Sequence, residues 1–245
     1  MSETGSGFVV WVQGLFERIQ LVFYAPRAAF AAVRGRETAQ DWLLPTLLVC
    51  LVGLAAHQLT LDVLTDLEAP AVQRRLESMS EEGRQRYEQS TAMLRAHGWM
   101  TIPVGTFTSL VIVGGVLMAM ARSLFLVEVN YRQMLVVKAY AASVVAVEWV
   151  LQAALIWSTG DPGLKLGFGA LLSDGVAATF VGRVLSAVNP FDLWQIGIMG
   201  VGLSAMVDVP KEKAIIAIVL LWMFWLVGGV GVETISRNLP PPPQG

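Results

Sequence analysis

The sequence predicts an all-α, polytopic integral membrane protein with five transmembrane helices, an interfacial amphipathic helix at the N-terminus and a helical insertion outside the membrane. Only 15% of the 245 residues are charged and 55% are hydrophobic, with a mean hydropathy of +0.59. A soluble domain usually carries about 25% charged residues. Several runs near 20 residues have no Asp, Glu, Lys or Arg, and such runs cross the hydrocarbon core as helices that satisfy their own backbone amides.

The N-terminal region, residues 1–41, is expected to lie in or near the cytoplasmic membrane interface. The stretch FVVWVQGLFERIQLVF, residues 8–23, is apolar, and its polar positions 13, 17 and 20 fall on one side of a helix. A helix lying in the interface explains this pattern better than a sixth span does. It is expected to end before Pro26, and a second short amphipathic piece follows over 28–33.

The five-span domain is expected over residues 42–236. The first span follows from the uncharged run 42–61, and the second and fifth from the uncharged runs 101–121 and 214–232. The third run contains one charge, Glu148, and the fourth, which begins at the Asn-Pro-Phe-Asp sequence, has its one charge near its start. The predicted spans are therefore 42–61, 101–121, 137–159, 191–207 and 214–234.

The polar insertion, residues 62–99, interrupts the spans and holds seven acidic residues and five arginines. Its second half suits an exposed helix with Ser80 as N-cap and Gly98 as the end. A solvated cap and a partner-binding surface both fit this composition.

The segment 161–188 is apolar but carries Asp174 and Arg183 and several glycines, which favours an interfacial or partly inserted segment over a full span. The tail 237–245 contains four consecutive prolines and is expected to be an extended polyproline end.

Loop charges indicate an orientation. With five spans, residues 1–41, the loop 122–138 and the loop 208–213 share one side, and they carry four, three and two Lys or Arg residues. Positive residues in short loops favour the cytoplasm. The N-terminus is therefore expected in the cytoplasm and the C-terminus outside it.

A glycine pattern in the fourth span resembles a nucleotide-binding fingerprint but predicts helix packing. Gly200-Val-Gly202-Leu-Ser-Ala205 fits G-x-G-x-x-G/A. A dinucleotide loop requires a preceding β-strand and an exposed turn, whereas these glycines lie inside an uncharged run. Small residues four apart let membrane helices approach closely. The pairs that predict such contacts are Gly200 with Ser204, Gly115 with Ala119, and Ala139 with Ser143.

The sequence offers no catalytic, cofactor-binding or metal-binding set. The single cysteine, Cys50, lies in the first span, and the two histidines, His57 and His97, are 40 residues apart. There is no H-E-x-x-H motif and no Walker loop. A net charge of −2 argues against nucleic acid as a partner. The sequence therefore predicts a non-enzyme with no cofactor and no nucleotide.

Glu148 is the candidate intramembrane functional residue. A charged group near mid-membrane costs roughly 2.5 to 3.5 kcal/mol on insertion scales unless it is protonated or paired. One interpretation is an ion or proton relay group. The other is a neutral acid that is hydrogen-bonded to a neighbouring helix through Gln195 or His57. Nearby, Asp192 suits the N-terminal end of a helix and Trp194 suits the interfacial aromatic belt.

Several motifs, in order, resemble the Yip family of five-span membrane proteins. Asn189-Pro-Phe191-Asp192-Leu-Trp194, a glycine-bearing span, a short loop with Asp208 and a last apolar span are similar to the C-terminal half of that family. Earlier matches are Ala25-Pro26, Asp41-Trp42-Leu-Leu-Pro45, Asn130-Tyr131-Arg132-Gln133, and Tyr140, which falls where the family often has a Gly-Tyr pair. The resemblance extends from about residue 20.

Some features depart from the family pattern, and the long insertion together with the short N-terminus points to its bacterial branch. Ala139 replaces the expected glycine, the Tyr-Gly-Pro signature of eukaryotic members is absent, and the insertion 62–99 is long. The family is named for interaction with Ypt/Rab GTPases, and that role does not transfer here. The resemblance implies a bacterial inner-membrane location and the family-motif or packing residues Pro26, Tyr140, Phe191, Asp192, Trp194, Gly200 and Ser204.

Two functions fit these observations. The first is a non-catalytic membrane protein that organises the lipid bilayer, membrane-protein partners or its own homo-oligomer. The alternative is a small transporter, channel or lipid-moving protein that uses Glu148. The absence of an evident inverted repeat weakens the alternative, since many transporters carry one.

Overall fold

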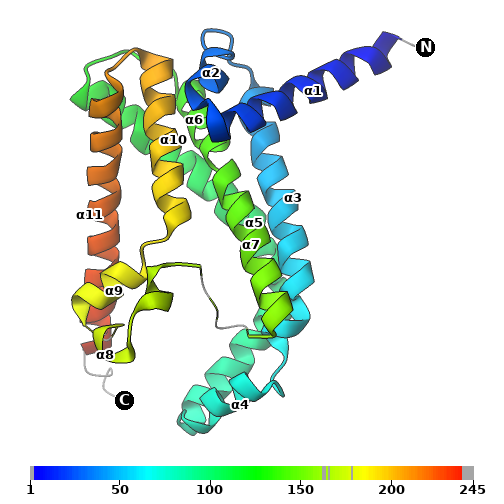
Figure 1. Cartoon of the computed structure of the whole chain (residues 1–245), viewed down its shortest axis with the longest axis vertical. Helices are drawn as coiled ribbons and strands as arrows, with labels where there is room; N and C mark the ends of the chain where they lie inside the picture. The colour runs from blue at the N-terminus through cyan, green and yellow to red at the C-terminus, as the bar shows by residue number, and fades with distance from the viewer. Residues whose placement is uncertain (1–2, 162–163, 165, 178, 239–245) are drawn as a thin grey trace, which may run out of the picture.

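A computed structural model describes residues 3–161, 164, 166–177 and 179–238, and its secondary structure within them is helical throughout. The five long helical rods alternate in direction, so the two ends of the chain lie at opposite ends of the bundle (Figure 1). The elements are α1 Glu3–Tyr24, α2 Pro26–Ala31, α3 Ala39–Thr65, α4 Pro70–Glu77, α5 Glu81–Leu124, α6 Tyr131–Ala141, α7 Ser143–Thr159, a 3-10 turn η1 Phe168–Leu171, α8 Asp174–Ala177, α9 Phe180–Ser186, α10 Pro190–Val207 and α11 Lys211–Asn238.

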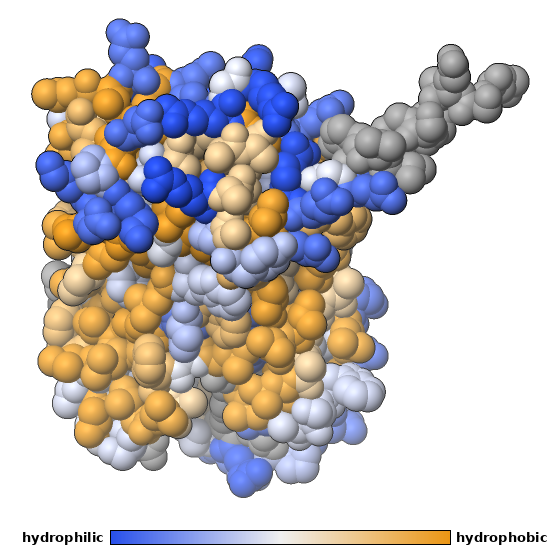
Figure 2. Space-filling model, turned by 45° about the horizontal axis from the view of Figure 1, so that its top comes forward, coloured by the Kyte–Doolittle hydropathy of each residue, from blue (hydrophilic) through white to orange (hydrophobic). Residues whose placement is uncertain are grey.

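Five helices are long and apolar enough to cross a membrane, which confirms the predicted fold class. They are α3, α5, the pair α6–α7 (Tyr131–Thr159), α10 and α11 as far as Gly231. Hydrophobic side chains cover the walls of the bundle, while hydrophilic residues gather over the end that carries α2 (Figure 2). The pair α6–α7 is the most buried of the five and α11 the least, so α6–α7 forms the centre. The chain is an integral membrane protein.

The third rod begins earlier than the sequence suggests. Asn130 caps α6, since its side-chain oxygen accepts from the Arg132 N–H at 3.3 Å, while Gln133 Oε1 accepts from the Asn130 N–H at 3.0 Å. The helix therefore starts at Tyr131, whereas 137 was expected. Lys138, which was counted as a loop cation, lies inside α6 with 8% of its surface exposed. The count of short-loop cations on this side falls by one.

The second half of the helical insertion and the second span form one continuous helix of 44 residues, α5, while the first half holds the end of α3 and the short helix α4. Ser80 caps it as predicted, with its hydroxyl accepting from the Gly83 N–H at 3.2 Å. The prediction that Gly98 ends the helix is wrong. A Cβ at Gly98 would lie 2.8 Å from His57 Cε1. This glycine therefore lies inside α5 and allows α5 and α3 to approach each other closely. Close packing, not chain termination, explains the residue.

Over the part of helix α1 whose side chains are described, residues 13–24, one side packs on the bundle. Leu15, Ile19 and Val22 are buried, while the polar positions 13, 17 and 20 are exposed. An ion pair of 3.3 Å between Arg18 and Asp41 ties the helix to the start of α3. The N-terminal part of α1 runs away from the bundle, across the direction of the spans (Figure 1).

Polar contacts join the connecting segments at the end that carries α1 and α2. Arg34 donates to the Asp208 carboxylate at 2.9 Å, which links the segment before α3 to the turn after α10. Gln133 Nε2 donates to Glu37 Oε1 at 3.2 Å, which links the same segment to the start of α6. The three segments that were expected to share one side therefore meet at one end of the bundle.

The Arg34–Asp208 pair predicts a small, acid-sensitive contribution to stability. Hydrogen bonding and charge from Arg34 hold the pKa of Asp208 below its ordinary value. A group with a depressed folded pKa stabilises the fold at higher pH and loses that contribution as the pH falls through the folded pKa. The wild type is expected to lose stability relative to Asp208→Asn as the pH drops below about 4. The loss is small because both side chains are exposed.

Chemical unfolding of both proteins at pH 6 and pH 3 measures this difference. Asparagine is the matched substitution, because Asp208 has a left-handed backbone with φ of 59° and asparagine tolerates that conformation. A stability difference between the two proteins that is the same at both pH values would show that the pair does not contribute. Salt should shrink the difference at pH 6.

Of the three predicted small-residue pairs, the structure shows a close helix approach at Gly200 and none at Gly115. A Cβ at Gly200 would lie 2.9 Å from Ile215 Cα, so α10 and α11 approach closely there. Ala139 and Ser143 are buried against neighbouring helices. A Cβ at Gly115, in contrast, would meet nothing within 4 Å. The preceding residue, Gly114, faces α6, so Gly115 points in a different direction.

Candidate functional site: a polar ladder between the third and fourth spans

Several polar residues of the third and fourth spans lie where these two spans pack against each other. The side-chain amide of Asn189 donates to Glu148 Oε1 on α7. The oxygen of the same amide accepts from the Phe191 N–H at 3.0 Å and so caps α10. Asn189 therefore uses one amide to begin the fourth span and to satisfy the acid of the third. We call the set Lys138, Glu148, Asn189, Asp192 and Gln195 the polar ladder.

The ladder continues along α10 towards the end of the bundle that carries α2. Asp192, in the first turn of α10, is within electrostatic range of both Glu148 and Lys138. One turn further, Gln195 Nε2 donates to the Ala141 carbonyl at 3.4 Å, at the break between α6 and α7. Because α7 and α10 run in opposite directions, these groups stand side by side. Two acids and one buried cation thus share one interface inside the membrane domain.

A second polar residue on α7, Gln152, contacts the segment between α7 and α10. We call this segment, residues 161–188, the returning segment. The Gln152 amide nitrogen donates to the Leu164 carbonyl, and the amide oxygen accepts from the Leu166 N–H at 2.9 Å. Gln152 lies one helical turn beyond Glu148, so the two side chains share a face of α7. One holds the beginning of the returning segment and the other, through Asn189, holds its end.

The returning segment contains short elements only, in the part that the structure describes. Its longest helix, α9, has seven residues, and the Phe168 N–H donates to the Val188 carbonyl at 3.3 Å, which closes the segment on itself. Helix α7 continues eleven residues past Glu148 to Thr159, a length of about 16 Å. The chain must return over that depth to reach Asn189. This geometry favours a partly inserted segment, and its place in the membrane stays a prediction.

The expected partners of Glu148 are corrected. Neither Gln195 nor His57 contacts it as proposed; Asn189 is its partner. Gln195 is nearly two turns further along α10, and His57 faces Gly98 on α5. Spacing along the sequence did not show which helix faces Glu148, because that depends on the rotation of each helix about its axis.

The aromatic family-motif residues have packing positions. Tyr140 is fully buried and meets Phe30 edge to face, with ring centroids 6.0 Å apart. Trp194 meets Phe23 of α1 in the same way at 5.5 Å. Phe191 is half-buried against the main core. These contacts join α1 and α2 to the third and fourth spans.

The remaining motif residues shape the backbone. Pro26 is the first residue of α2, a position where its missing N–H is not needed. The Ser204 hydroxyl donates to the Val209 carbonyl at 2.7 Å and closes the turn after α10. Gly200 provides the close approach to α11.

Three polar residues of these contacts, Lys138, Gln152 and Asn189, were not identified as functional residues from the sequence, although Asn189 stands in the family-like motif. Gln152 could have been found, since AVEWVLQ places two polar side chains four residues apart in an otherwise apolar run. The burial of Lys138 carried no such signal, because a lysine at the edge of an apolar run usually belongs to a loop. Among the described residues, no group of three or more His, Cys, Asp or Glu side chains is placed to hold a metal ion.

Comparison with known protein families agrees with the fold. The Yip1 domain model matches residues 21–232, which is most of the chain. No curated protein and no solved structure matched the chain. The matched range begins within α1 and includes all five spans and the whole polar ladder. The chain therefore belongs to the Yip1 domain family.

Proposed function

We propose that this protein is a non-catalytic organiser of the membrane, and that α1 acts as an amphipathic helix held in the interface by the bundle. The observation that supports this proposal is the position of α1. Its C-terminal half is fixed on the bundle by Leu15, Ile19 and Val22, and by the Arg18–Asp41 pair. Its N-terminal half extends beyond the bundle (Figure 1).

The apolar spacing of this helix continues in the sequence before residue 13. Residues 8, 11 and 12 stand four, seven or eight positions before Leu15 or Ile19, a spacing typical of one apolar helical face. An apolar helical face in one leaflet displaces headgroups and favours curvature. Anchoring such a helix to five spans fixes its depth and direction, which a free amphipathic peptide lacks. The proposed location is a bacterial inner membrane, with α1 on the cytoplasmic side.

Liposome reconstitution tests the proposal. Vesicles with the full-length protein are expected to be smaller, by cryo-electron microscopy, than protein-free vesicles of the same lipid. Trp11→Glu places a charge on the apolar face of α1 and should restore the larger diameter. Gln13→Glu adds the same charge on the polar face and serves as the matched control. Equal diameters with and without protein, or no effect of Trp11→Glu, would contradict the proposal.

The polar ladder supports a second candidate, transport of protons or small ions. Lys138, Asp192 and Glu148 line one interface inside the membrane domain, which is where transporters place coupling groups. Proteoliposomes with a pH-sensitive dye should then show proton flux that Glu148→Gln abolishes. Flux equal to that of protein-free vesicles would exclude this candidate and leave Glu148 as a structural residue.

A further inference from the structure

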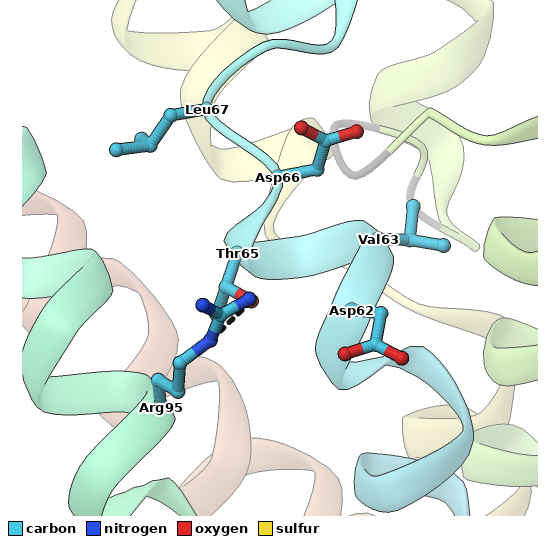
Figure 3. A pocket seen from close by; sticks show the side chains of 6 residues that line it. All are labelled: Asp62, Val63, Thr65, Asp66, Leu67 and Arg95. Atoms are coloured by element: carbon cyan, nitrogen blue, oxygen red, sulfur yellow. Dashed lines mark hydrogen bonds between the residues drawn. The ribbon is translucent and has the colours of Figure 1, made fainter.

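A charged hollow lies where the first and second spans emerge from the membrane domain, at the end of the bundle opposite α1. Its volume is about 520 Å³, and the last turns of α3 and the middle of α5 line it. Arg95 reaches across from α5 to Thr65, while Asp62 and Asp66 stand on either side of Thr65 along the chain (Figure 3). One cation and two carboxylates therefore line the hollow, and the two carboxylates point away from each other (Figure 3).

Most of the hydrogen-bonding capacity of these groups is unused by the described part of the chain. Arg95 donates through Nε to the Thr65 hydroxyl at 3.1 Å, which leaves its four terminal N–H groups available. Asp66 accepts one bond, from the Glu68 N–H to Oδ1 at 2.9 Å. Asp62 has no hydrogen-bond partner among the described residues, and no ion pair there joins it to Arg95. The hollow offers donors on one side and acceptors on the other.

The electrostatic balance favours a ligand that carries both signs of charge. The C-terminal end of α3 adds free carbonyl oxygens and the negative end of a helix dipole to the two carboxylates. An anion alone would be repelled by these negative groups, and a cation alone would be repelled by Arg95. A guanidinium binds phosphate oxygens well, and carboxylates accept strong hydrogen bonds from an ammonium group. A phosphate joined to a primary ammonium satisfies both sides.

The position of the hollow identifies the source of such a ligand. Asp62 is the first charged residue after the uncharged run 42–61, and Arg95 precedes the uncharged run 101–121. The hollow therefore lies at a membrane boundary. Leu59 is three residues before Asp62, and Trp99 is four residues after Arg95, so each lies on the hollow's side of its helix. Both are about half exposed, and by sequence they precede or follow the hollow on its membrane side, so they offer apolar surface to an acyl chain.

We propose that this hollow binds the headgroup of a phospholipid with a primary ammonium, the phosphatidylethanolamine class. Arg95 holds the phosphate, and one of the two carboxylates, Asp62 or Asp66, accepts a hydrogen bond from the ammonium. The acyl chains leave the hollow along Leu59 and Trp99. A trimethylammonium headgroup has no N–H to donate, and a glycerol headgroup donates only from uncharged hydroxyls, which bind a carboxylate less strongly than an ammonium does. The site therefore distinguishes lipids by headgroup.

Native mass spectrometry of the full-length protein in detergent tests the site. Phosphatidylethanolamine, phosphatidylcholine and phosphatidylglycerol with identical acyl chains are added separately, and the bound fraction gives a dissociation constant for each. Phosphatidylethanolamine is expected to bind about tenfold more tightly than phosphatidylcholine, the difference for one charge-assisted hydrogen bond. Soluble phosphoethanolamine should compete weakly, because it lacks the chains.

Variants assign the two halves of the site. Arg95→Gln should weaken all three lipids, whereas the double variant Asp62→Asn, Asp66→Asn should remove only the preference for phosphatidylethanolamine. Arg86→Gln, on an exposed turn of the same helix, is the control and should change nothing. Equal binding of phosphatidylethanolamine and phosphatidylcholine, or an unaltered preference in the double variant, would overturn the proposal. Full competition by soluble phosphoethanolamine would overturn the assignment to a lipid.

Discussion

The Gly53→Leu variant is expected to lose about 3 kcal/mol of unfolding free energy, the upper part of the range for overpacked cores. Gly53 lies in α3 where α5 and α7 meet it. A Cβ there would lie 2.2 and 2.5 Å from two atoms of the Trp149 ring, and 2.8 Å from an Ile102 methyl. The ring must move, and it is held between helices. A leucine therefore separates three of the five spans.

Gly115→Leu provides the matched control in the neighbouring helix. A Cβ at Gly115 would meet nothing within 4 Å, so the same substitution adds no clash and improves helix propensity. Thermal and chemical unfolding in one detergent should separate the two variants by several degrees or more. If Gly115→Leu were as destabilising as Gly53→Leu, the packing of α3 against α7 would be wrong.

The second large effect is expected at Asn189. Asn189→Ala should cost about 2 kcal/mol, from roughly 1 for the lost helix cap and about 1 for the lost bond between helices. The variant leaves the Phe191 N–H and the Glu148 carboxyl without their partner inside the membrane domain. Because Asn189 joins the returning segment to α10, proteolysis of residues 161–188 should also increase. Stability and limited proteolysis in detergent measure the two effects.

Two conservative variants separate the two roles of this side chain. Asn189→Asp keeps a good cap but places a second carboxyl against Glu148. This variant should therefore be less stable than the wild type. Adding Glu148→Gln supplies an amide that donates to the new aspartate and should restore stability. Glu148→Gln alone should keep the fold, because its oxygen still accepts from Asn189. A double variant no more stable than Asn189→Asp would show that the two residues do not interact.

Features that depend on short stretches of chain were predictable. Each span is a property of one uninterrupted run, because about 20 apolar residues without charge have one stable solution in a bilayer. The Ser80 cap is likewise local, since its partner Gly83 is three residues away. The amphipathic pattern of α1 was visible for the same reason. The resemblance to the Yip family rested on the order of such local motifs.

Features that depend on how the helices face one another were not predictable. Asn189 and Glu148 are 41 positions apart, and hydropathy does not record the rotation of a helix about its axis. The rotation of α5 also explains why a Cβ at Gly114 would lie 2.9 Å from Leu135, whereas a Cβ at Gly115 would have no neighbour within 4 Å. The sequence by itself thus predicted the five apolar runs that form the five long helices, but not where each helix begins: α5 starts at Glu81 and α6 at Tyr131, where 101 and 137 were expected. The tertiary structure alone decided which polar groups meet between them, because that choice depends on packing between distant segments.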